Sequence, residues 1–425
     1  MPIDFTSLGH ASPYPERGPR LLPWLLIWGL FATIGAGTVM FLWPAGKLAT
    51  GPKFWFLVAC LPSICFLAVL GLARFAFEAE WLGAHARNVA RWQRLRERCQ
   101  QAQRPLQILG GGYCLPLDGQ VLSDVVSAGV PVLKAQNARI GPGMIVHSRF
   151  AEDSVSRIPS ERAASCPDDE EEQGALEIEV ATLMLKIAEA LAPLTASLMA
   201  LSQYGAAYSP AVRILAREDV VASCLQQVKD ALRLAGLPDL ECKSVPEADG
   251  LMVADAWLDA RDRRPLLVVA VEWYEECPPS GSVEGCVAVL LNAGYYKLPE
   301  PVKVVGKLHR PVKGEWHALD RLLILAGIWG RANPSVIKLA WVGGLSSELD
   351  MAWLAACRTA SLDHITQHET HRRLDRLVGD AGPASAWLSV VAAVEAGGTG
   401  PQLVVDGAQA AVLYVLPTAH DNNNR

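Results

Sequence analysis

Two long apolar runs near the N-terminus constrain this chain more than any other feature. Leu21–Trp43 contains no charged residue in 23 positions, and Phe54–Phe77 contains only Arg74. At a rise of about 1.5 Å per residue, each run is long enough as a helix to cross roughly 30 Å of hydrocarbon. The connection over residues 44–53 is short, so the two helices must be antiparallel. The sequence therefore predicts a transmembrane helical hairpin over residues 21–78.

Two alternatives fit the apolar runs less well. Helices of a soluble core usually expose one polar face, and neither run has one. The apolar part of a signal peptide is about 7–15 residues long, whereas the first run is longer and is followed at once by a second. Gly35 and Pro62 are compatible with membrane helices, in which such residues are common.

A cluster of arginines directly follows the second run and predicts the orientation. It comprises Arg87, Arg91, Arg94, Arg96 and Arg98. The positive-inside rule places this cluster in the cytoplasm, with residues 1–20 as a cytoplasmic tail and 79–104 as a basic juxtamembrane helix that faces lipid headgroups. We therefore expect a two-span protein of the bacterial inner membrane whose remaining domain, 105–425, is cytoplasmic. A nucleic-acid site is the competing interpretation, but the adjacent membrane span and a net charge of −6 favour the lipid bilayer.

The region after residue 105 has the pattern of an α/β fold. The strands predicted at Leu266–Trp273 and Val336–Val342 are apolar on both faces, which is typical of a sheet covered by helices on both sides. An acidic run, Asp168–Glu172, lies in a polar segment that we expect to form a mobile loop over 152–174. Ten cysteines are scattered without any C-x-x-C pair, which is typical of small core residues in a reducing compartment.

The order of these elements resembles a known superfamily. Val245–Trp273 and Leu377–Leu416, which includes the turn GDAGPASAW, resemble β-ketoacyl synthases of the thiolase-like superfamily, with the match better in the second half of the fold than over 120–174. The resemblance implies a layered α/β thiolase-like body. It also implies a nucleophilic cysteine at a helix start, a general acid/base histidine in a G-H-x-x-x-A-like turn, and a homodimer formed through a strand of the first half.

The chain departs from that superfamily at the positions that carry the chemistry. Glu247 stands where the resemblance expects the cysteine, and Asp380 follows Gly379 where it expects the histidine. Cys242 is the fallback nucleophile. Acyl transfer of this kind needs a thiolate at a helix N-terminus and imidazoles, whereas carboxylates repel the thioester oxyanion. We therefore predict a degenerate, non-catalytic body without a cofactor.

Three further motifs have a structural interpretation that we prefer. His364, His368 and His371 would share one face of a helix, but they lack the H-E-x-x-H spacing of a zinc site, so no metal is predicted. Gly110–Gly112 follows a strand without a G-K-[ST] sequence and is interpreted as a bend. Glu272, Glu275 and Glu276 are interpreted as a solvated loop end.

The function that follows is a membrane-anchored scaffold or adaptor whose thiolase-like body binds a protein partner. Its architecture is similar to that of accessory proteins of bacterial type VI secretion loci, which implies an effector or secretion component as the partner. The alternative is an acyl-transferring or acyl-binding ketosynthase-like enzyme that uses Cys242. A transporter is a third class, but the two spans contain no carboxylate or histidine.

Overall fold

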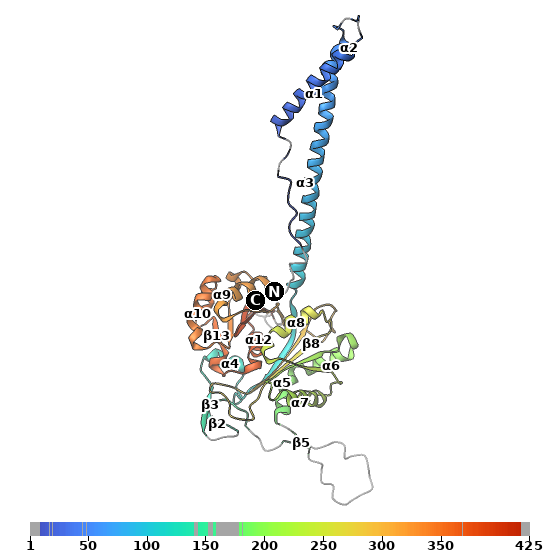
Figure 1. The fold of residues 1–425 in the computed structure, drawn as a ribbon. Helices are drawn as coiled ribbons and strands as arrows, with labels where there is room; N and C mark the ends of the chain where they lie inside the picture. Colours follow the sequence, from blue (N-terminus) through green and yellow to red (C-terminus); the bar gives the residue numbers. More distant parts are fainter. Residues whose placement is uncertain are drawn as a thin grey trace, which may run out of the picture. The chain divides into compact units, whose positions relative to one another are not determined.

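The computed structural model describes two compact units, which divide between Gln101 and Ala102 (Figure 1). The described residues are 9–16, 18, 20–44, 46–47, 49–139, 143–151, 156–158, 178–180, 182–367 and 369–417. Most of the acidic segment 152–174 and His368 lie outside these ranges, so the mobile loop stays a prediction.

The N-terminal unit is a helical hairpin. α1 (Leu21–Leu42) is followed by a loop, and α2 (Pro52–Trp55) continues through a π-helical turn (Phe56–Cys60) into α3 (Leu61–Ala102). Leu22–Leu42 and Pro52–Ala102 are long and apolar enough to cross a membrane. Both helices are consistent with membrane association. The arginine-rich segment is not a separate helix, because α3 runs through it without a break.

The two helices of the hairpin contact each other through small and aromatic residues. A β-carbon on Gly35 would lie 2.3 Å from Cγ of Pro62, so α1 and α3 approach as closely as they do only because residue 35 is glycine. Trp28 Nε1 donates to Ser63 Oγ over 3.4 Å. The rings of Trp24 and Phe66 lie 6.1 Å apart. Close packing of this kind associates helices in a lipid environment, where the hydrophobic effect does not.

Residues of the N-terminal tail lie along α3. Ser12 N donates to Asn88 Oδ1 over 2.8 Å, and Asn88 Nδ2 donates back to Ser12 O over 3.0 Å. Arg91 Nε donates to Gly9 O over 3.0 Å, and the Tyr14 ring lies 5.7 Å from the Trp81 ring. The tail and the part of α3 that follows the apolar run are therefore on the same side of any membrane that the hairpin crosses.

The second unit contains an 11-stranded sheet made of two similar halves. The sheet order is β13-β12-β14-β15-β10-β1-β9-β8-β6-β7, with β11 paired to β15. Each half contributes five main strands. When these are numbered one to five along the chain, they lie side by side in the sheet in the order 3-2-4-5-1. The fifth strand of each half is antiparallel to both of its neighbours. The first half comprises β1 (Leu106–Cys114), β6 (Ala211–Leu215), β7 (Glu241–Val245), β8 (Leu266–Glu272) and β9 (Gly285–Asn292). The second comprises β10 (Gly306–Leu308), β12 (Ala340–Gly343), β13 (His371–Arg373), β14 (Gly400–Asp406) and β15 (Gln409–Val415).

The remaining strands are short. Two pairs stand outside the main sheet, β2 (Lys134–Asn137) with β3 (Met144–His147) and β4 (Ser156–Ile158) with β5 (Ile178–Val180). β9 and β10 follow one another in the chain but do not pair, because β1 lies between them and is antiparallel to both. The last two strands, β14 and β15, form an antiparallel pair.

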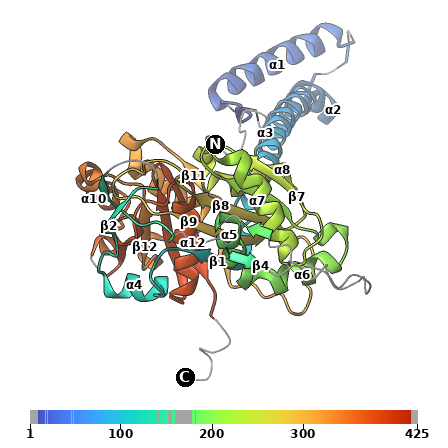
Figure 2. The ribbon, with the colours of Figure 1, turned by 90° about the horizontal axis from the view of Figure 1, so that it is seen from below.

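Helices cover both faces of the sheet (Figure 2). α5 (Thr182–Leu191) packs on β1 and β9, and α7 (Val221–Leu234) packs on β6 and β7. α12 (Ser385–Glu395) packs on β1, β9, β12 and β14, and nine of its eleven residues are buried. β8 and β9 are buried along their whole length, as their sequence predicts. The remaining helices are α4 (Leu122–Ala128), α6 (Thr195–Gln203), α8 (Met252–Ala260), α9 (Leu319–Trp329), α10 (Asp350–Thr359) and α11 (Leu374–Leu377).

A third apolar helix, Thr182–Gln203, also meets the length and composition of a membrane span. Its first part is α5, and the residues that make it apolar, Leu183, Ile187 and Leu191, are buried among the strands and α7. A 3₁₀ turn with Pro193 separates α5 from α6. Since the apolar face already packs on protein, this helix belongs to the core of the second unit.

The glycine triplet of β1 serves helix packing. A β-carbon on Gly112 would lie 2.3 Å from Ala190 O, and one on Gly111 would lie 2.6 Å from Cγ2 of Val391. α5 and α12 therefore contact β1 from opposite faces at a distance that only glycine permits. The predicted bend has a counterpart in β1, whose register against β9 shifts between Ile108 and Gly110, but none of the three glycines has a positive φ, so the need for glycine comes from helix packing.

Candidate functional site at the junction of the halves

Two carboxyl groups occupy equivalent places in the two halves. β8 ends at Glu272 and β14 ends at Asp406, and each strand is the fourth of its half, between a parallel and an antiparallel neighbour. Burial raises the pKa of Glu272 to about 7 and that of Asp406 to about 7. Each of these two apolar strands thus ends in a carboxyl group that stays largely protonated until the pH approaches neutrality.

Glu272 is almost completely buried. The residue is 1% exposed, and the neighbouring Tyr274 hydroxyl and Arg217 guanidinium offset only part of the rise in its pKa that burial causes. Arg217 Nη1 is the nearest cation, 3.7 Å from Oε1. Besides burial, the negative charges of Asp380 and Glu247 raise the pKa of Glu272. The predicted solvated loop end is therefore wrong for Glu272, although Glu275 and Glu276 are exposed.

The turn that carries Asp380 packs against Glu272. Asp380 Oδ1 accepts from Gly382 N and from Ser385 Oγ, each over 3.0 Å, and so ties the turn before α12 to the first residue of that helix. Gly382 has φ of +50°, which favours glycine. A β-carbon there would lie 2.1 Å from Glu272 Oε2. The second half thereby places a glycine turn directly on the buried acid of the first half.

The turn that carries Glu247 is held by side chains of the second half. Gln409 Oε1 accepts from Leu251 N over 2.8 Å, and Gln409 Nε2 donates to Ala248 O over 2.9 Å. Trp387 Nε1 of α12 donates to Gly250 O over 3.1 Å. The backbone N–H of Leu251, at the start of α8, therefore already has a hydrogen-bond acceptor within the protein. Glu247 itself is exposed.

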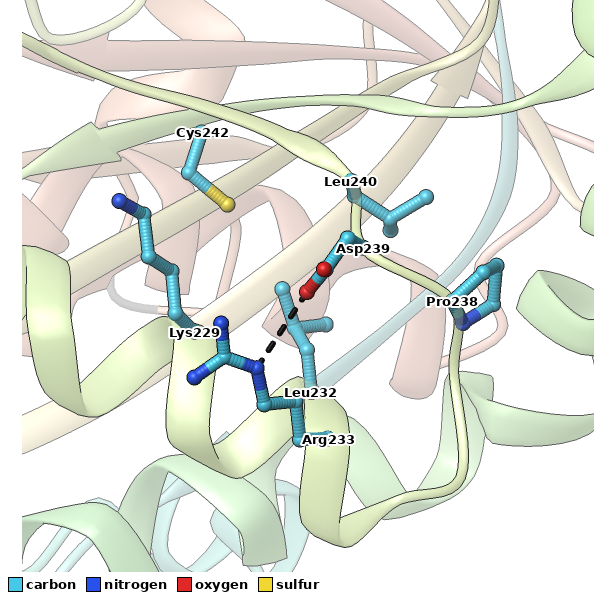
Figure 3. A pocket seen from close by; sticks show the side chains of 7 residues that line it. All are labelled: Lys229, Leu232, Arg233, Pro238, Asp239, Leu240 and Cys242. Atoms are coloured by element: carbon cyan, nitrogen blue, oxygen red, sulfur yellow. Dashed lines mark hydrogen bonds and ion pairs between the residues drawn. The ribbon is translucent and has the colours of Figure 1, made fainter.

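Cys242 lies apart from these two turns, on the edge strand β7. It lines a pocket of about 250 Å³ together with Lys229, Leu232, Arg233, Pro238, Asp239 and Leu240 (Figure 3). Burial raises the pKa of the Cys242 thiol, and the nearby Lys229 and Arg213 charges oppose that rise only in part. None of the seven residues that line this pocket is a histidine. The thiol is therefore mainly protonated at neutral pH.

The predicted histidine motif is not on one helical face. His364 lies in a 3₁₀ turn and its Nε2 is 2.6 Å from Ile337 O, whereas His371 lies in β13 and stacks on Trp353. Burial lowers the pKa of His371 to about 4. Among the described residues, no group of three His, Cys, Asp or Glu side chains is arranged to hold a metal ion.

Asp406 is not a candidate from the sequence alone. The sequence feature that could have indicated Asp406 is a repeated pattern, in which an apolar strand ends in an acidic residue. This pattern occurs as LLVVAVE, which ends at Glu272, and as QLVVD, which ends at Asp406. The pattern becomes informative only when the sheet order shows that both strands hold the fourth position of a half.

Solved structures identify the fold. No family model and no curated protein matches the sequence. A chain of the AntDE:AntF complex, a type II PKS acyl-carrier protein with its ketosynthase bound to the hexaketide, matches with a TM-score of 0.50 at 10% identity, over 74% of this chain and 99% of its own.

The body has the thiolase-like fold. The ketosynthase of module 6 of the bacillaene synthase from Bacillus subtilis has a TM-score of 0.49 at 10% identity, over 74% of this chain and 71% of its own. The 3-oxoacyl-(acyl carrier protein) synthase III from Pseudomonas aeruginosa has a TM-score of 0.40 at 15% identity, over 74% and 99%. The predicted fold is confirmed, and both thiolase-like halves are present, including the first half, which the sequence alone matched poorly.

Proposed function

We propose that this protein is a membrane-anchored adaptor whose thiolase-like body binds a protein partner and does not condense acyl groups. The observation that carries the proposal is the set of carboxylates at the junction of the halves. Glu247 and Asp380 stand where the resemblance expects a thiol and an imidazole, and the buried acid Glu272 lies beside them. Negative charge at this place opposes an oxyanion, which condensing chemistry must stabilise.

The anchor supports a location on a membrane, and we propose the cytoplasmic face of the bacterial inner membrane. The N-terminal tail contacts α3 just beyond the apolar run, where Arg87 and Arg91 lie. Arginines that follow a span are retained on the cytoplasmic side and are attracted to anionic lipids. The partner that we propose is an effector or component of a type VI secretion system, an assignment that rests on architecture alone. The homodimer implied by the resemblance would use the edge strand β7.

An acyl-transferring or acyl-binding enzyme is the second candidate. The observation that favours it is the pocket around Cys242, in which Lys229 supplies a positive charge that lowers the thiol pKa. The net rise in that pKa weighs against it, because a thiolate is the nucleophile in acyl transfer.

Two measurements on the full-length protein separate the candidates. An adaptor extracted from native membranes in mild detergent should retain a protein partner in near-stoichiometric yield, and Cys242→Ala should retain the same partner. An enzyme should be labelled by an acyl-mimicking electrophile at Cys242, with Cys242→Ala as the unlabelled control. Recovery of the bait alone would contradict the adaptor. Selective labelling of Cys242 over the exposed Cys277 would favour the enzyme.

A further inference from the structure

One edge of β1 is only partly paired. The strand pairs with β9 from Gln107 to Cys114, whereas its other edge pairs with β10 over Leu106–Ile108 alone. The register against β9 shifts by one residue between Ile108 and Gly110, and a bulge of this kind bends the strand that carries it. The bend explains why pairing with β10 ends there. From Leu109 to Tyr113, none of the strands that the structure describes lies on the second edge of β1.

The unpaired edge presents backbone donors and acceptors. Alternate residues of a strand direct their N–H and C=O groups to the same side, so an edge without a neighbouring strand carries a row of free groups. Within the described chain, the ladder with β9 provides all the hydrogen bonds that reach the backbone of residues 109–113. Proteins often protect such an edge with lysine or proline, and the sequence LGGGY contains neither. The edge is therefore open to a further strand.

An apolar groove of about 490 Å³ includes this part of β1. Gly111, Gly112 and Tyr113 line it from the strand. Most of its other lining residues are apolar and come from α12 and from the segments that follow β1 and α5, among them Val121, Pro193, Val390, Val391 and Val394. An extended peptide that adds to a sheet obtains affinity from backbone hydrogen bonds and specificity from pockets for alternate side chains. The groove and the open edge supply these two requirements at one place.

A carboxylate without a cationic partner lines the same groove. Glu395 is the last residue of α12 and is exposed. Its Oε1 accepts from Tyr113 Oη over 3.3 Å, and among the described residues no lysine, arginine or histidine pairs with it. The groove lining contains no other charged residue. The charge of the groove is therefore complementary to a basic side chain, and an ion pair with Glu395 would set the position of the occupant.

We propose that the edge of β1 from Leu109 to Tyr113 is the site at which the protein partner binds, and that the partner adds an extended strand with alternate apolar residues and a lysine or arginine that meets Glu395. A polypeptide strand is the occupant that this edge selects. A lipid or acyl chain could fill the apolar groove, but it would leave the backbone N–H and C=O groups of β1 without partners. The inference rests on the proposed adaptor function, and it names the surface and the chemistry of the partner.

The test is fluorescence polarisation with the full-length protein in mild detergent. The probes are two labelled peptide amides, Lys-Val-Thr-Val-Thr-Val and the same sequence with the lysine at the other end. The control peptides have the same side chains, but their backbone amides are N-methylated and cannot donate to a neighbouring strand. We expect saturable binding of at least one probe and no binding of its N-methylated control.

A charge reversal tests the role of Glu395. Glu395→Lys should weaken binding of the lysine peptide by about tenfold, the effect of losing one charge-assisted contact. The same variant should bind better when glutamate replaces the lysine of the peptide. Glu348→Lys is the matched control, because Glu348 is also exposed and does not line the groove. It should bind both peptides as the wild type does.

Three results would overturn the proposal. Absence of saturable binding, or equal binding of the N-methylated peptide, would mean that the edge does not accept a strand. Equal affinities of Glu395→Lys and the wild type would remove the basic residue from the partner's chemistry. Tighter peptide binding after deletion of residues 418–425, which lie outside the described ranges, would assign the edge to the chain's own C-terminal residues instead of a partner.

The adaptor function is tested separately, by recovery of a partner from native membranes. If the wild type and Glu395→Lys recover the same partner equally and the probe peptides do not bind, the adaptor function stands and this site is refuted. If the probe peptides bind as expected and no partner is recovered, the site stands and the adaptor function is refuted.

Discussion

Gly382 lies against the carboxylate of Glu272 so closely that a β-carbon on the glycine would be 2.1 Å from Oε2. The two residues come from different halves of the body, and each depends on the other. The acid is buried because the turn covers it, and the turn needs glycine because the acid fills the space beneath it. The contact joins the two halves at the place where the resemblance expects catalytic groups.

Gly382→Ala should destabilise the protein. The new methyl group would overlap Glu272 Oε2, and alanine is strained at φ of +50°. Overpacking of this kind costs about 1–3 kcal/mol. Thermal unfolding of the full-length protein in detergent measures the effect. Gly327→Ala in α9 is the control, because its nearest neighbour atom would be 3.5 Å away. A melting temperature equal to that of the control would show that the turn is not packed as described.

The pH dependence of stability should report Glu272. Its pKa is about 7 in the folded protein against 4.5 when unperturbed, so the unfolded state ionises first as the pH rises. The protonated acid therefore contributes fully to the free energy of unfolding below about pH 4.5, and this contribution is lost as the pH rises to about 7. The free energy of unfolding falls by about 3 kcal/mol over this pH range. Glu272→Gln should therefore melt higher than the wild type at pH 8 and no higher at pH 4.5. Glu276→Gln, at an exposed site, is the control. Parallel curves for the wild type and Glu272→Gln would refute a raised pKa.

Gln409→Ala should loosen the turn before α8. The variant leaves the buried Leu251 N–H without its acceptor and Ala248 O without its donor. A buried polar group left unsatisfied costs about 1–3 kcal/mol. We expect a lower melting temperature and faster proteolysis near Glu247. Mass spectrometry of the fragments measures the rate of cleavage at that turn. Gln226→Ala, on the exposed face of α7, should change neither. Unchanged protection of the turn would mean that Gln409 does not hold it.

Two glycines of α1 offer a matched pair for the hairpin. Gly35→Leu would drive its side chain into Pro62, whereas a β-carbon on Gly37 would meet no atom within 4 Å, so Gly37→Leu should be tolerated. The readout is cross-linking by a short bis-maleimide reagent between cysteines placed at Trp28 and Ser63, whose native side chains are in contact. We expect this cross-link to be lost in Gly35→Leu and kept in Gly37→Leu. If both variants keep it, α1 and α3 do not pack through Gly35.

The proposed orientation predicts which cysteines are reached from outside the cell. With the arginine-rich part of α3 in the cytoplasm, Cys99 should react with a membrane-impermeant maleimide only after permeabilisation. A cysteine introduced at Gly46, in the loop between the spans, should react in intact spheroplasts. The reverse pattern would place the body on the other side of the membrane.

The apolar hairpin and several strands are predictable because their signals are local. The length of each apolar run can be read directly from the sequence. The residues Leu266–Glu272 are all apolar except the last, so they predict a strand buried on both faces even when its neighbours in the sheet are unknown. Elements that depend on partners are predicted less well. The local pattern favours a helix over residues 371–373, but these residues form β13 and pair in parallel with β12. Similarly, chain order favours pairing of β9 with β10, because the sequence does not reveal that β1 inserts between them.

By itself, the sequence determined the apolar helical hairpin, the α/β class and the presence of carboxylates at Glu247 and Asp380, because composition and short-range spacing encode all three. Only the tertiary structure decided that Glu272 and Asp406 occupy equivalent places, that Gln409 holds the turn before α8, and that Cys242 lies apart from both turns. These relationships join residues that are far apart in the chain. Burial and proximity, which set a pKa and close a turn, arise only when the two halves pack together.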